Sequence, residues 1–452
     1  MLFLSIAAAS LCQTPAAPDP RPEETSPYQY FGSIVGHAGD VDRDGVPDIL
    51  IGDSEYPSLR LPPTVWIVSG ANGIVLRRVE LPVAEPGPRI VEGSPAICLD
   101  GGFDLDDDGI PDFVAGVSRG SVDDSRHVHV VSGRTGQVIR TISSKFVGFD
   151  TAGWVHLVRD IDGDGIVDIG ILCPRTGEGR GSLRFFSGKS GKEFLTLDIQ
   201  NEGEARFGSF CELSSGNHPE DREFAVLLDV GDCGWPSPPT KLGLGEARRS
   251  SLRIYSAAKR IKTWEQLLEG VDRAGEAGAE LAEVGRVPTA NSTSILLACG
   301  GSARVLCVPD HETRFRFDPE EGWEGLGQAL AAPGDLDRDG VPDFVYSVWD
   351  TGTYDGMVVA KSGKDGRTLW SATSNFTQED IHHLGAQLAV IGDIDDDGIA
   401  DLAVATNEGP ATICPGSAVV YSGKSGTRLF CFMRKGNDVV VADMRKASET
   451  KR

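Results

Sequence analysis

One nine-residue pattern occurs five times in this chain and limits what it can fold into more than any other feature. The first copy, Asp40–Asp48, has aspartates at its positions 1, 3, 5 and 9 and a glycine, Gly45, at position 6. The other copies run from Asp104 to Asp112, Asp160 to Asp168, Asp335 to Asp343 and Asp393 to Asp401. Glycine permits the sharp reversal that lets alternate side chains of a short loop converge. Five copies with one spacing indicate a repeated structural unit.

The converging aspartates predict a metal site in each loop. Ca²⁺ is bound by carboxylate oxygens together with backbone carbonyls, such as the one at position 7 of related loops. The predicted ligands are Asp40, Asp42, Asp44, Val46 and Asp48; Asp104, Asp106, Asp108, Ile110 and Asp112; Asp160, Asp162, Asp164, Ile166 and Asp168; Asp335, Asp337, Asp339, Val341 and Asp343; and Asp393, Asp395, Asp397, Ile399 and Asp401. We therefore expect about five Ca²⁺ ions with a structural role.

Two other interpretations of the loops are weaker. An EF-hand needs a glutamate at position 12 and flanking helices, whereas Ile51 in an apolar run holds that position in the first loop. A solvated acidic turn would explain one copy but not the same spacing in all five.

Short apolar runs around the loops predict β-strands in a fixed order. The third run of each unit occurs seven times, and most copies end in Ser-Gly, as Val65–Gly70 and Ala418–Gly423 do. The fourth and fifth units lack the aspartates, at Asn217–Phe224 and Arg286–Ser294, so we expect seven units but five calcium sites. The region from Thr263 to Val284 has helical composition, but alignment on Gly278 places its second half on the opening strand of the fifth unit.

Seven units of four antiparallel strands predict an all-β fold, a seven-bladed β-propeller. A linear array of separate modules is the alternative layout. Continuous apolar second strands, such as Leu402-Ala-Val404, indicate burial on both faces and favour a closed ring.

These features resemble the FG-GAP repeat family, whose best-known members are the propellers at the head of integrin alpha subunits. The likeness rests on Phe31-Gly32, Phe207-Gly208, the five aspartate loops and the glycines Gly52 and Gly116. It implies that calcium loops join strands 1 and 2 on one rim and that ligands bind the opposite rim. Unlike integrin alpha subunits, the sequence shows neither leg domains nor a transmembrane helix, so we expect a free-standing secreted propeller rather than a receptor.

The ends of the chain differ from the repeats. Residues 1–12 form a short apolar segment typical of a secretory signal, and Cys12 leaves a lipoprotein as an alternative. We predict a Pro-rich linker at 13–26, the propeller at 27–433 and a tail at 434–452, in a secreted, cell-surface or periplasmic protein without a transmembrane span. The other eight cysteines leave two possibilities open: disulfides, such as Cys299–Cys307 and Cys211–Cys233, or free thiols.

The formal charge of -24 argues against a nucleic-acid partner. Trp235, Trp349 and Tyr354 lie in predicted strand 2–3 loops and are candidate ligand contacts, although each ring could instead pack on its own loop. His127 and His129 could form half of a transition-metal site, but ordinary strand positions explain them better. We expect a monomeric, non-catalytic module that binds an extracellular protein or glycan in adhesion. The alternative is an enzyme, a lyase or hydrolase of extracellular glycans, with the propeller as its scaffold.

Overall fold

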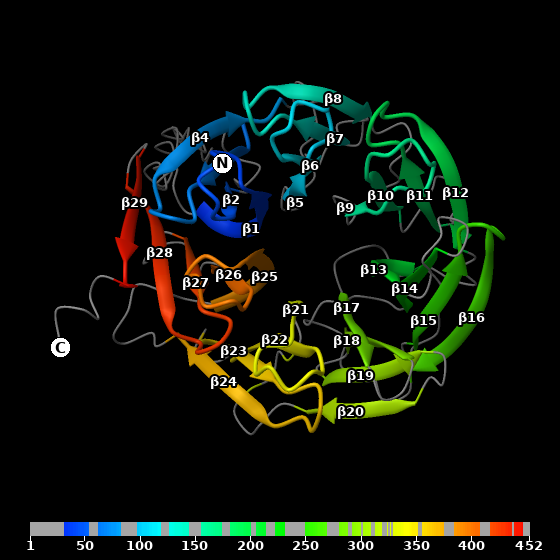
Figure 1. The fold of residues 1–452 in the computed structure, drawn as a ribbon. Coiled ribbons are helices and arrows are strands. Elements are labelled where there is room, and N and C mark those ends of the chain that lie inside the picture. Colours follow the sequence, from blue (N-terminus) through cyan, green and yellow to red (C-terminus); the bar gives the residue numbers. More distant parts are fainter. Residues whose placement is uncertain are drawn as a thin grey trace, which may run out of the picture.

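The fold is a closed ring of seven antiparallel β-sheets around a common centre (Figure 1). It is seen in a computed structural model that describes residues 31–53, 62–82, 97–118, 126–143, 155–173, 181–199, 205–213, 222–230, 249–268, 280–287, 292–299, 302–308, 312–318, 323, 326, 329–350, 355–374, 384–406, 416–435 and 438–445. The predicted seven-bladed propeller of four-stranded antiparallel blades is confirmed. The first strand of each blade lies nearest the centre (Figure 1).

Each blade is built from one continuous stretch of chain. Blades 1 to 3 contain β1 (Phe31–Gly39), β2 (Asp48–Asp53), β3 (Thr64–Val68), β4 (Val75–Glu80); β5 (Ile97–Phe103), β6 (Asp112–Ser118), β7 (Arg126–Val131), β8 (Val138–Ser143); β9 (Val155–Val158), β10 (Asp168–Cys173), β11 (Gly181–Phe186) and β12 (Glu193–Ile199). Blades 4 and 5 contain β13 (Ala205–Leu213), β14 (Glu223–Val230), β15 (Arg249–Ser256), β16 (Ile261–Leu268); β17 (Glu280–Val287), β18 (Ser292–Cys299), β19 (Ser302–Val308) and β20 (Thr313–Phe317). Blades 6 and 7 contain β21 (Leu330–Gly334), β22 (Asp343–Trp349), β23 (Gly356–Lys361), β24 (Thr368–Thr373); β25 (Leu384–Gly392), β26 (Asp401–Thr406), β27 (Ser417–Tyr421), β28 (Arg428–Lys435) and β29 (Asp438–Asp443).

The apolar runs are buried because neighbouring blades cover both faces of each sheet. Every residue of β2, β10 and β26 is buried. One core cluster joins Phe31, Ile49 and Trp66 of blade 1 to Phe430 and Phe432 of blade 7. The core is thus a set of layers between blades, which explains why the second strands show no polar alternation.

Two regions show how pairing overrides local sequence signals. In the stretch of helical composition, β17 is the opening strand that the repeat predicted, and the first residues of the stretch belong to β16, whose Trp264 and Leu268 pack into the core between blades 4 and 5. The sequence showed no clear first strand in the second blade, but β5 supplies it. A Cβ on Gly101 would lie 2.7 Å from the backbone oxygen of His37, so this strand needs a glycine to approach blade 1.

Among the described strands, those of the first and last blades stay in separate sheets, and the ring closes by contacts between the two. We call the junction of blades 7 and 1 the seam. Gln387 of β25 accepts a hydrogen bond from the backbone N–H of Val35 at 3.0 Å across the seam. Gly32, with a φ of +77°, approaches the backbone of Ser417 so closely that a Cβ would lie 2.3 Å from it. This contact explains the glycine of the Phe31-Gly32 pair.

A hydrogen bond from the fourth strand of one blade to the strand 3–4 turn of the next occurs at several junctions. The donors and acceptors are Arg77 and the Arg134 carbonyl, Arg140 and the Gly188 carbonyl, Arg314 and the Lys364 carbonyl, and Trp370 and the Gly423 carbonyl, at 2.6–3.1 Å. These bonds tie neighbouring blades together at their outer edge.

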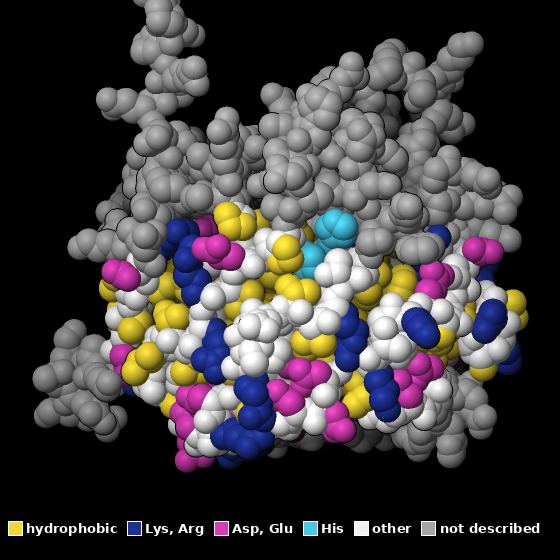
Figure 2. Space-filling model, turned by 90° about the horizontal axis from the view of Figure 1, so that it is seen from above, with side chains coloured by type: hydrophobic (Ala, Val, Ile, Leu, Met, Phe, Trp, Pro, Cys, Tyr) yellow, Lys and Arg dark blue, Asp and Glu magenta, His cyan; other side chains and the backbone are white. Residues whose placement is uncertain are grey.

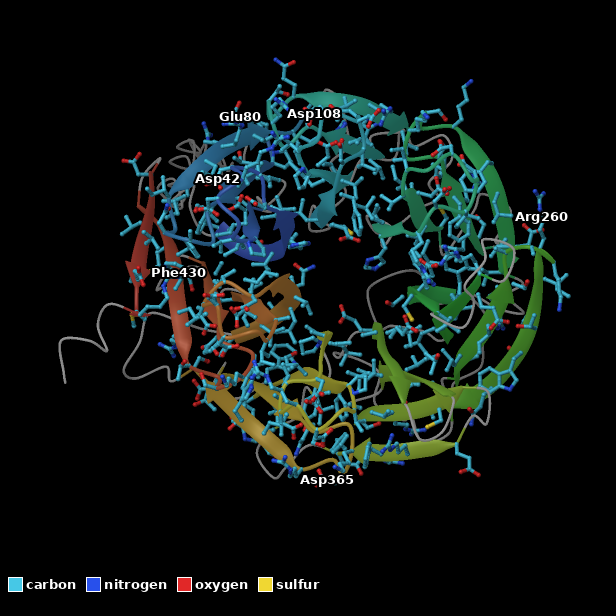
Figure 3. All side chains as sticks on the ribbon, in the orientation of Figure 1. Asp42, Glu80, Asp108, Arg260, Asp365 and Phe430 are labelled. Atoms are coloured by element: carbon cyan, nitrogen blue, oxygen red, sulfur yellow. The ribbon has the colours of Figure 1, made fainter. Side chains whose placement is uncertain are left out.

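Arg445 supplies the corresponding bond at the seam. The third residue of β28 is Phe430 (Figure 3), whose side chain has no hydrogen-bond donor. β29, within the predicted tail, pairs with β28 and extends this sheet past residue 433. Arg445 follows β29, lies with its guanidinium 4.1 Å from the centroid of Phe430, and donates to the Ala71 carbonyl of blade 1 at 2.7 Å. The chain end therefore completes the ring.

Replacing Arg445 with alanine should lower the free energy of unfolding by about 1–2 kcal/mol, because a cation–π contact and a hydrogen bond across the seam are both lost. Urea denaturation would measure the loss. Arg78→Ala, in an exposed ion pair on β4, is the matched control and should change stability by less than about 1 kcal/mol. Equal losses in the two variants would count against a closing role for Arg445.

Five cysteines are free thiols: Cys98, Cys173, Cys211, Cys307 and Cys431. The suggested Cys299–Cys307 disulfide is wrong, because the two residues lie at opposite ends of the β18–β19 hairpin, paired with Ser302 and Ser294 respectively. Cys211 is likewise not in a disulfide with Cys233, which lies outside the described residues. Within the described part of the chain, no helix has the length and apolar character needed to cross a membrane.

Candidate metal-binding loops

The five aspartate loops occupy equivalent places in the ring. Each joins the first and second strands of its blade, in blades 1, 2, 3, 6 and 7. Asp42 and Asp108 mark the loops of two neighbouring blades in Figure 3. In the side view of Figure 2, acidic and basic side chains are interspersed along the lower rim of the ring.

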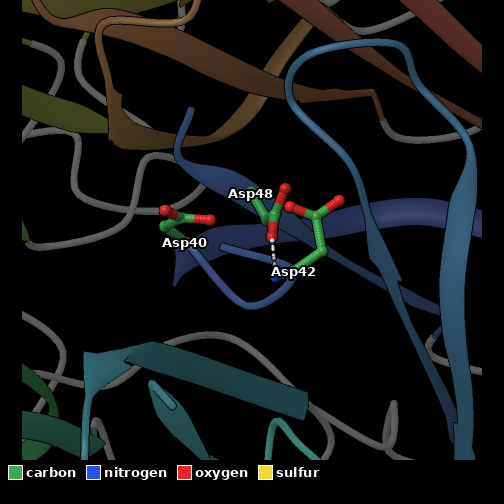
Figure 4. A group of neighbouring side chains, drawn as sticks. All are labelled: Asp40, Asp42 and Asp48. Atoms are coloured by element: carbon green, nitrogen blue, oxygen red, sulfur yellow. Dashed lines mark hydrogen bonds between the residues drawn. The ribbon is translucent and has the colours of Figure 1, made fainter. Parts of the chain in front are cut away.

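In every one of these loops three carboxylates converge. The oxygens of Asp40, Asp42 and Asp48 lie within 4.8 Å of one another, and the three side chains face each other in Figure 4. The corresponding groups are Asp104, Asp106 and Asp108; Asp160, Asp162 and Asp168; Asp335, Asp337 and Asp339; and Asp393, Asp395 and Asp401. Each group could therefore hold a metal ion.

The aspartate at position 1 shapes the turn. Asp40 accepts hydrogen bonds from the backbone N–H groups of Asp44 and Gly45, both at 3.0 Å, and Gly45 has a φ of +91°. The N–H of Val46 donates to Asp44 at 2.9 Å. With the turn shaped in this way, the carboxylates at positions 1, 3 and 9 converge in blades 1, 3 and 7, and those at positions 1, 3 and 5 converge in blades 2 and 6.

The aspartate at position 9 has a second role that sequence analysis missed. Asp48 is fully buried, and its two oxygens accept N–H bonds from Val41 of its own loop at 2.8 Å and from Gly70 of the strand 3–4 turn at 3.1 Å. The same pair of bonds recurs at Asp112 with Leu105 and Gly133, Asp168 with Ile161 and Gly188, Asp343 with Leu336 and Gly363, and Asp401 with Ile394 and Gly423.

This bond also explains the glycine of the Ser-Gly phrase. A Cβ at Gly70 would lie 1.9 Å from the backbone oxygen of Pro47, so a side chain there would push the turn off the loop. In the other four blades, a Cβ on the glycine at the same position would likewise lie 1.8–1.9 Å from the backbone oxygen of the residue before the position-9 aspartate. The repeated Ser-Gly was the sequence signal, but its partner is recognisable only in three dimensions.

The position-9 aspartates are difficult to ionise without a metal. Burial raises the pKa of Asp48 and Asp401 to about 7, and that of Asp112, Asp168 and Asp343 to about 6. The backbone N–H bonds lower these pKa values in part, whereas the other loop carboxylates raise them. A bound cation would favour the ionised form of all five groups.

The calcium-free protein should therefore lose stability as pH rises from about 4 to 7. A carboxylate whose pKa is higher in the folded state stabilises the fold below its unfolded value of about 4, and this contribution disappears as pH passes the folded value. Thermal melts in chelator across this range would measure the fall. The same melts in excess calcium should show little fall, and a chelated protein that is equally stable at both pH values would contradict the prediction.

Two buried oxygens inside these loops fit a cation. Oδ1 of Asp106 and Oδ1 of Asp395, both at position 3, have no hydrogen-bond partner among the described residues. A buried carboxylate oxygen without a partner is destabilising, and a metal ion at the centre of the loop would satisfy it.

Blade 4, which lacks the aspartates, has an ion-pair network near the same rim. Glu212 of β13 accepts from Arg222 at 3.0 Å and from Arg159 of blade 3 at 2.7 Å. Arg159 directly precedes the acidic loop of blade 3, so this network links that loop to blade 4, which has no acidic loop of its own.

The candidate ligand-binding aromatics are mostly outside the described part of the chain. Trp235 and Tyr354 both lie there. Trp349 is partly buried at the end of β22, where it pairs with Gly356. A role for these three residues in ligand contact stays a prediction.

The histidine pair on β7 is engaged in structural contacts. Nε2 of His129 donates to the Pro82 carbonyl at 2.9 Å, so Nδ1 accepts from the hydroxyl of Thr141 at 2.9 Å. The ring of His127 lies 5.8 Å from that of His129. Ordinary strand positions therefore explain His129, as expected.

A different set of titratable groups meets on the innermost strands. Asp100 of β5 lies 3.6 Å from Nδ1 of His156 on β9 and accepts the N–H of Leu157 at 2.8 Å. Burial lowers the pKa of His37 on β1, and the charge of Asp100 opposes that shift. No sequence motif predicts that these residues lie together, because they come from three different blades.

No protein-family model matches the chain. The phosphatidylinositol-glycan-specific phospholipase D of Mus musculus is 26% identical over 397 residues, which cover 75% of this chain and 46% of that protein. The chain thus spans about half the length of this curated relative.

Two solved structures are similar in fold. The Dos1 propeller matches 92% of this chain and 95% of its own, with 12% identity and a TM-score of 0.49. The exotype rhamnogalacturonan lyase YesX matches 89% of this chain and 74% of its own, with 13% identity and a TM-score of 0.43.

The relationship to the phospholipase corrects one expectation. We expected a protein that is not an enzyme, but a relative that matches three quarters of the chain is a phospholipase D. The prediction of a non-catalytic protein was therefore wrong. It relied on the lack of a catalytic motif, which cannot reveal groups that meet only through folding.

Proposed function

We propose that the protein is a calcium-binding β-propeller of the FG-GAP type, with one ion in each of the five aspartate loops. The observation that carries this proposal is the fivefold convergence of three carboxylates within 4.8 Å. The buried oxygens of Asp106 and Asp395 that have no hydrogen-bond partner add to it. Aspartates at positions 1, 3, 5 and 9 and the carbonyl at position 7 would hold the ion.

The role of calcium would be structural. A divalent ion balances carboxylates that otherwise repel one another. The loop residues in turn fix the first residue of the second strand. Through the position-9 aspartate they also fix the strand 3–4 turn of the same blade. Each occupied loop would hold three strands of its blade in register.

Calcium titration of the chelator-stripped protein by calorimetry tests this function. We expect about five ions per chain, and one fewer when Asp42 is replaced by asparagine. Asp438→Asn, an exposed acidic position on β29 away from the loops, should leave the stoichiometry unchanged. Lack of binding at millimolar calcium would overturn the proposal.

We also propose that the propeller acts outside the cell as part of an enzyme for glycan-bearing substrates. The named specificity of the phospholipase relative supports this choice of substrate class. Asp100 and His156 on the innermost strands are the acid–base candidates, because their side chains approach within 3.6 Å. This role replaces adhesion as the preferred function, while glycan binding is common to both.

Turnover of glycosylphosphatidylinositol and of uronate-containing polysaccharides tests the enzyme proposal. His156→Gln should lower turnover on the order of a hundredfold, as expected for loss of an acid or base. His127→Gln on β7 is the matched control and should retain activity. Wild-type protein that cleaves neither substrate class would contradict the proposal.

A further inference from the structure

Building on the proposed calcium sites, we propose that the five loops differ in affinity because basic side chains of the fold act as tethered counter-charges. The loops of blades 1 and 3 are the two tightest sites, and the loop of blade 6, whose converging carboxylates carry two ion pairs, is the weakest. This ranking follows from which lysines and arginines form ion pairs with the carboxylates of each loop.

The first source of positive charge is the residue directly after the Ser-Gly phrase. It is basic in four of the five blades: Arg134, Lys189, Lys364 and Lys424. Three of these side chains reach the aspartate at position 5 of their own loop. Arg134 lies 2.7 Å from Asp108, and the lysines lie 3.7 Å from Asp339 and Asp397.

The second source is position 4 of the neighbouring loop. Arg43 and Arg338 hold left-handed backbone angles, with φ of 63° and 61°. Arg43 of blade 1 donates to the Gly109 carbonyl of blade 2 at 2.8 Å, and Arg338 of blade 6 donates to the Asp397 carbonyl of blade 7. The loops of blades 2 and 7 therefore each receive a cation from the preceding blade.

Blade 6 carries two cations on its own carboxylates. Lys364 approaches Asp339, and Arg367 donates to Asp337 at 2.5 Å. Asp337 and Asp339 both belong to the converging group of this loop. Both charges therefore act directly on candidate metal ligands.

Blade 1 has neither source. Ala71 follows its Ser-Gly phrase, and Asp396 occupies position 4 of the preceding loop. Among the described residues, no lysine or arginine forms an ion pair with its loop aspartates. Arg445 donates to the carbonyl of Ala71 and is paired with Asp443 at 3.1 Å.

A fixed positive charge near a divalent ion lowers its affinity. When a lysine or arginine contacts a ligand aspartate, its repulsion of the metal ion lowers the affinity for calcium about threefold to tenfold for each basic side chain, depending on salt. The serine at the turn of blade 3 shows the neutral alternative, because Ser187 donates to Asp164 at 3.1 Å in place of a cation.

Calorimetric calcium titration of variants at low salt tests the ranking. Ala71→Lys should weaken one of the two tightest binding events threefold to tenfold, and Asp42→Asn should abolish it. Joint replacement of Lys364 and Arg367 by alanine should strengthen the weakest event by at least the same factor. Lys259→Ala, in the corresponding turn of blade 4 without an acidic loop, should change nothing.

The outcomes separate this inference from the calcium proposal. If no calcium binds, the proposed function itself fails. If five ions bind but the Ala71 and Lys364/Arg367 variants titrate like the wild type, the counter-charge inference is overturned and the sites remain. Chelated melts of each variant that match the wild type show that altered binding does not arise from misfolding.

Discussion

Chelation of calcium should lower the melting temperature of this protein by roughly 10 °C or more. Each site filled at a hundredfold excess over its dissociation constant contributes about 2.7 kcal/mol, so several sites together are comparable to the stability of a typical domain. Without calcium the carboxylates would repel one another, and the buried position-9 aspartates would lose the cation that favours their ionised form.

Differential scanning calorimetry with calcium and with excess chelator measures this effect. Asp42→Asn removes one site and should show a proportionally smaller shift between the two conditions. Asp438→Asn is the control and should shift as the wild type does. Equal melting temperatures with and without calcium would show that the loops are acidic turns rather than structural sites.

Replacing Asp53 with alanine should lower the free energy of unfolding by about 3–5 kcal/mol, because it leaves a buried arginine without its partner. Asp53 of β2 pairs with Arg434 of β28 across the seam, and the two side chains are 2% and 4% exposed. The Arg434 guanidinium also lies 5.2 Å from the ring centroid of Trp66. Burial raises the pKa of Asp53 to about 6, although Arg434 opposes the shift.

Urea denaturation measures this loss in calcium-loaded protein. Glu80→Ala breaks the Arg78–Glu80 pair at the outer edge of blade 1 (Figure 3), whose side chains are about half exposed, and should cost less than about 1 kcal/mol. Replacing both Asp53 and Arg434 with apolar residues should recover part of the stability, because no unpaired charge remains. If Asp53→Ala and Glu80→Ala lowered the free energy of unfolding by similar amounts, the prediction that Asp53 compensates a buried charge would be contradicted.

Much of the architecture was predictable because its determinants are local. The aspartate loops, the apolar strands and the Ser-Gly turns each specify a hairpin within a short stretch of chain, and their repetition gave the number of blades. The same locality explains why the repeat correctly placed the opening strand of the fifth unit, Glu280–Val287, against helical composition.

Contacts between distant parts of the chain were decided only by the tertiary structure. Asp53 and Arg434 are 381 residues apart, and Val35 and Gln387 are 352 apart, so no local pattern links them. The approach of His37, Asp100 and His156, and the counter-charges on each loop, depend on which blades the closed ring makes neighbours. Sequence by itself determined the repeated unit and its acidic loops. The packing of blade against blade decided the seam and the surroundings of each site, because a side chain's partners there come from a different blade.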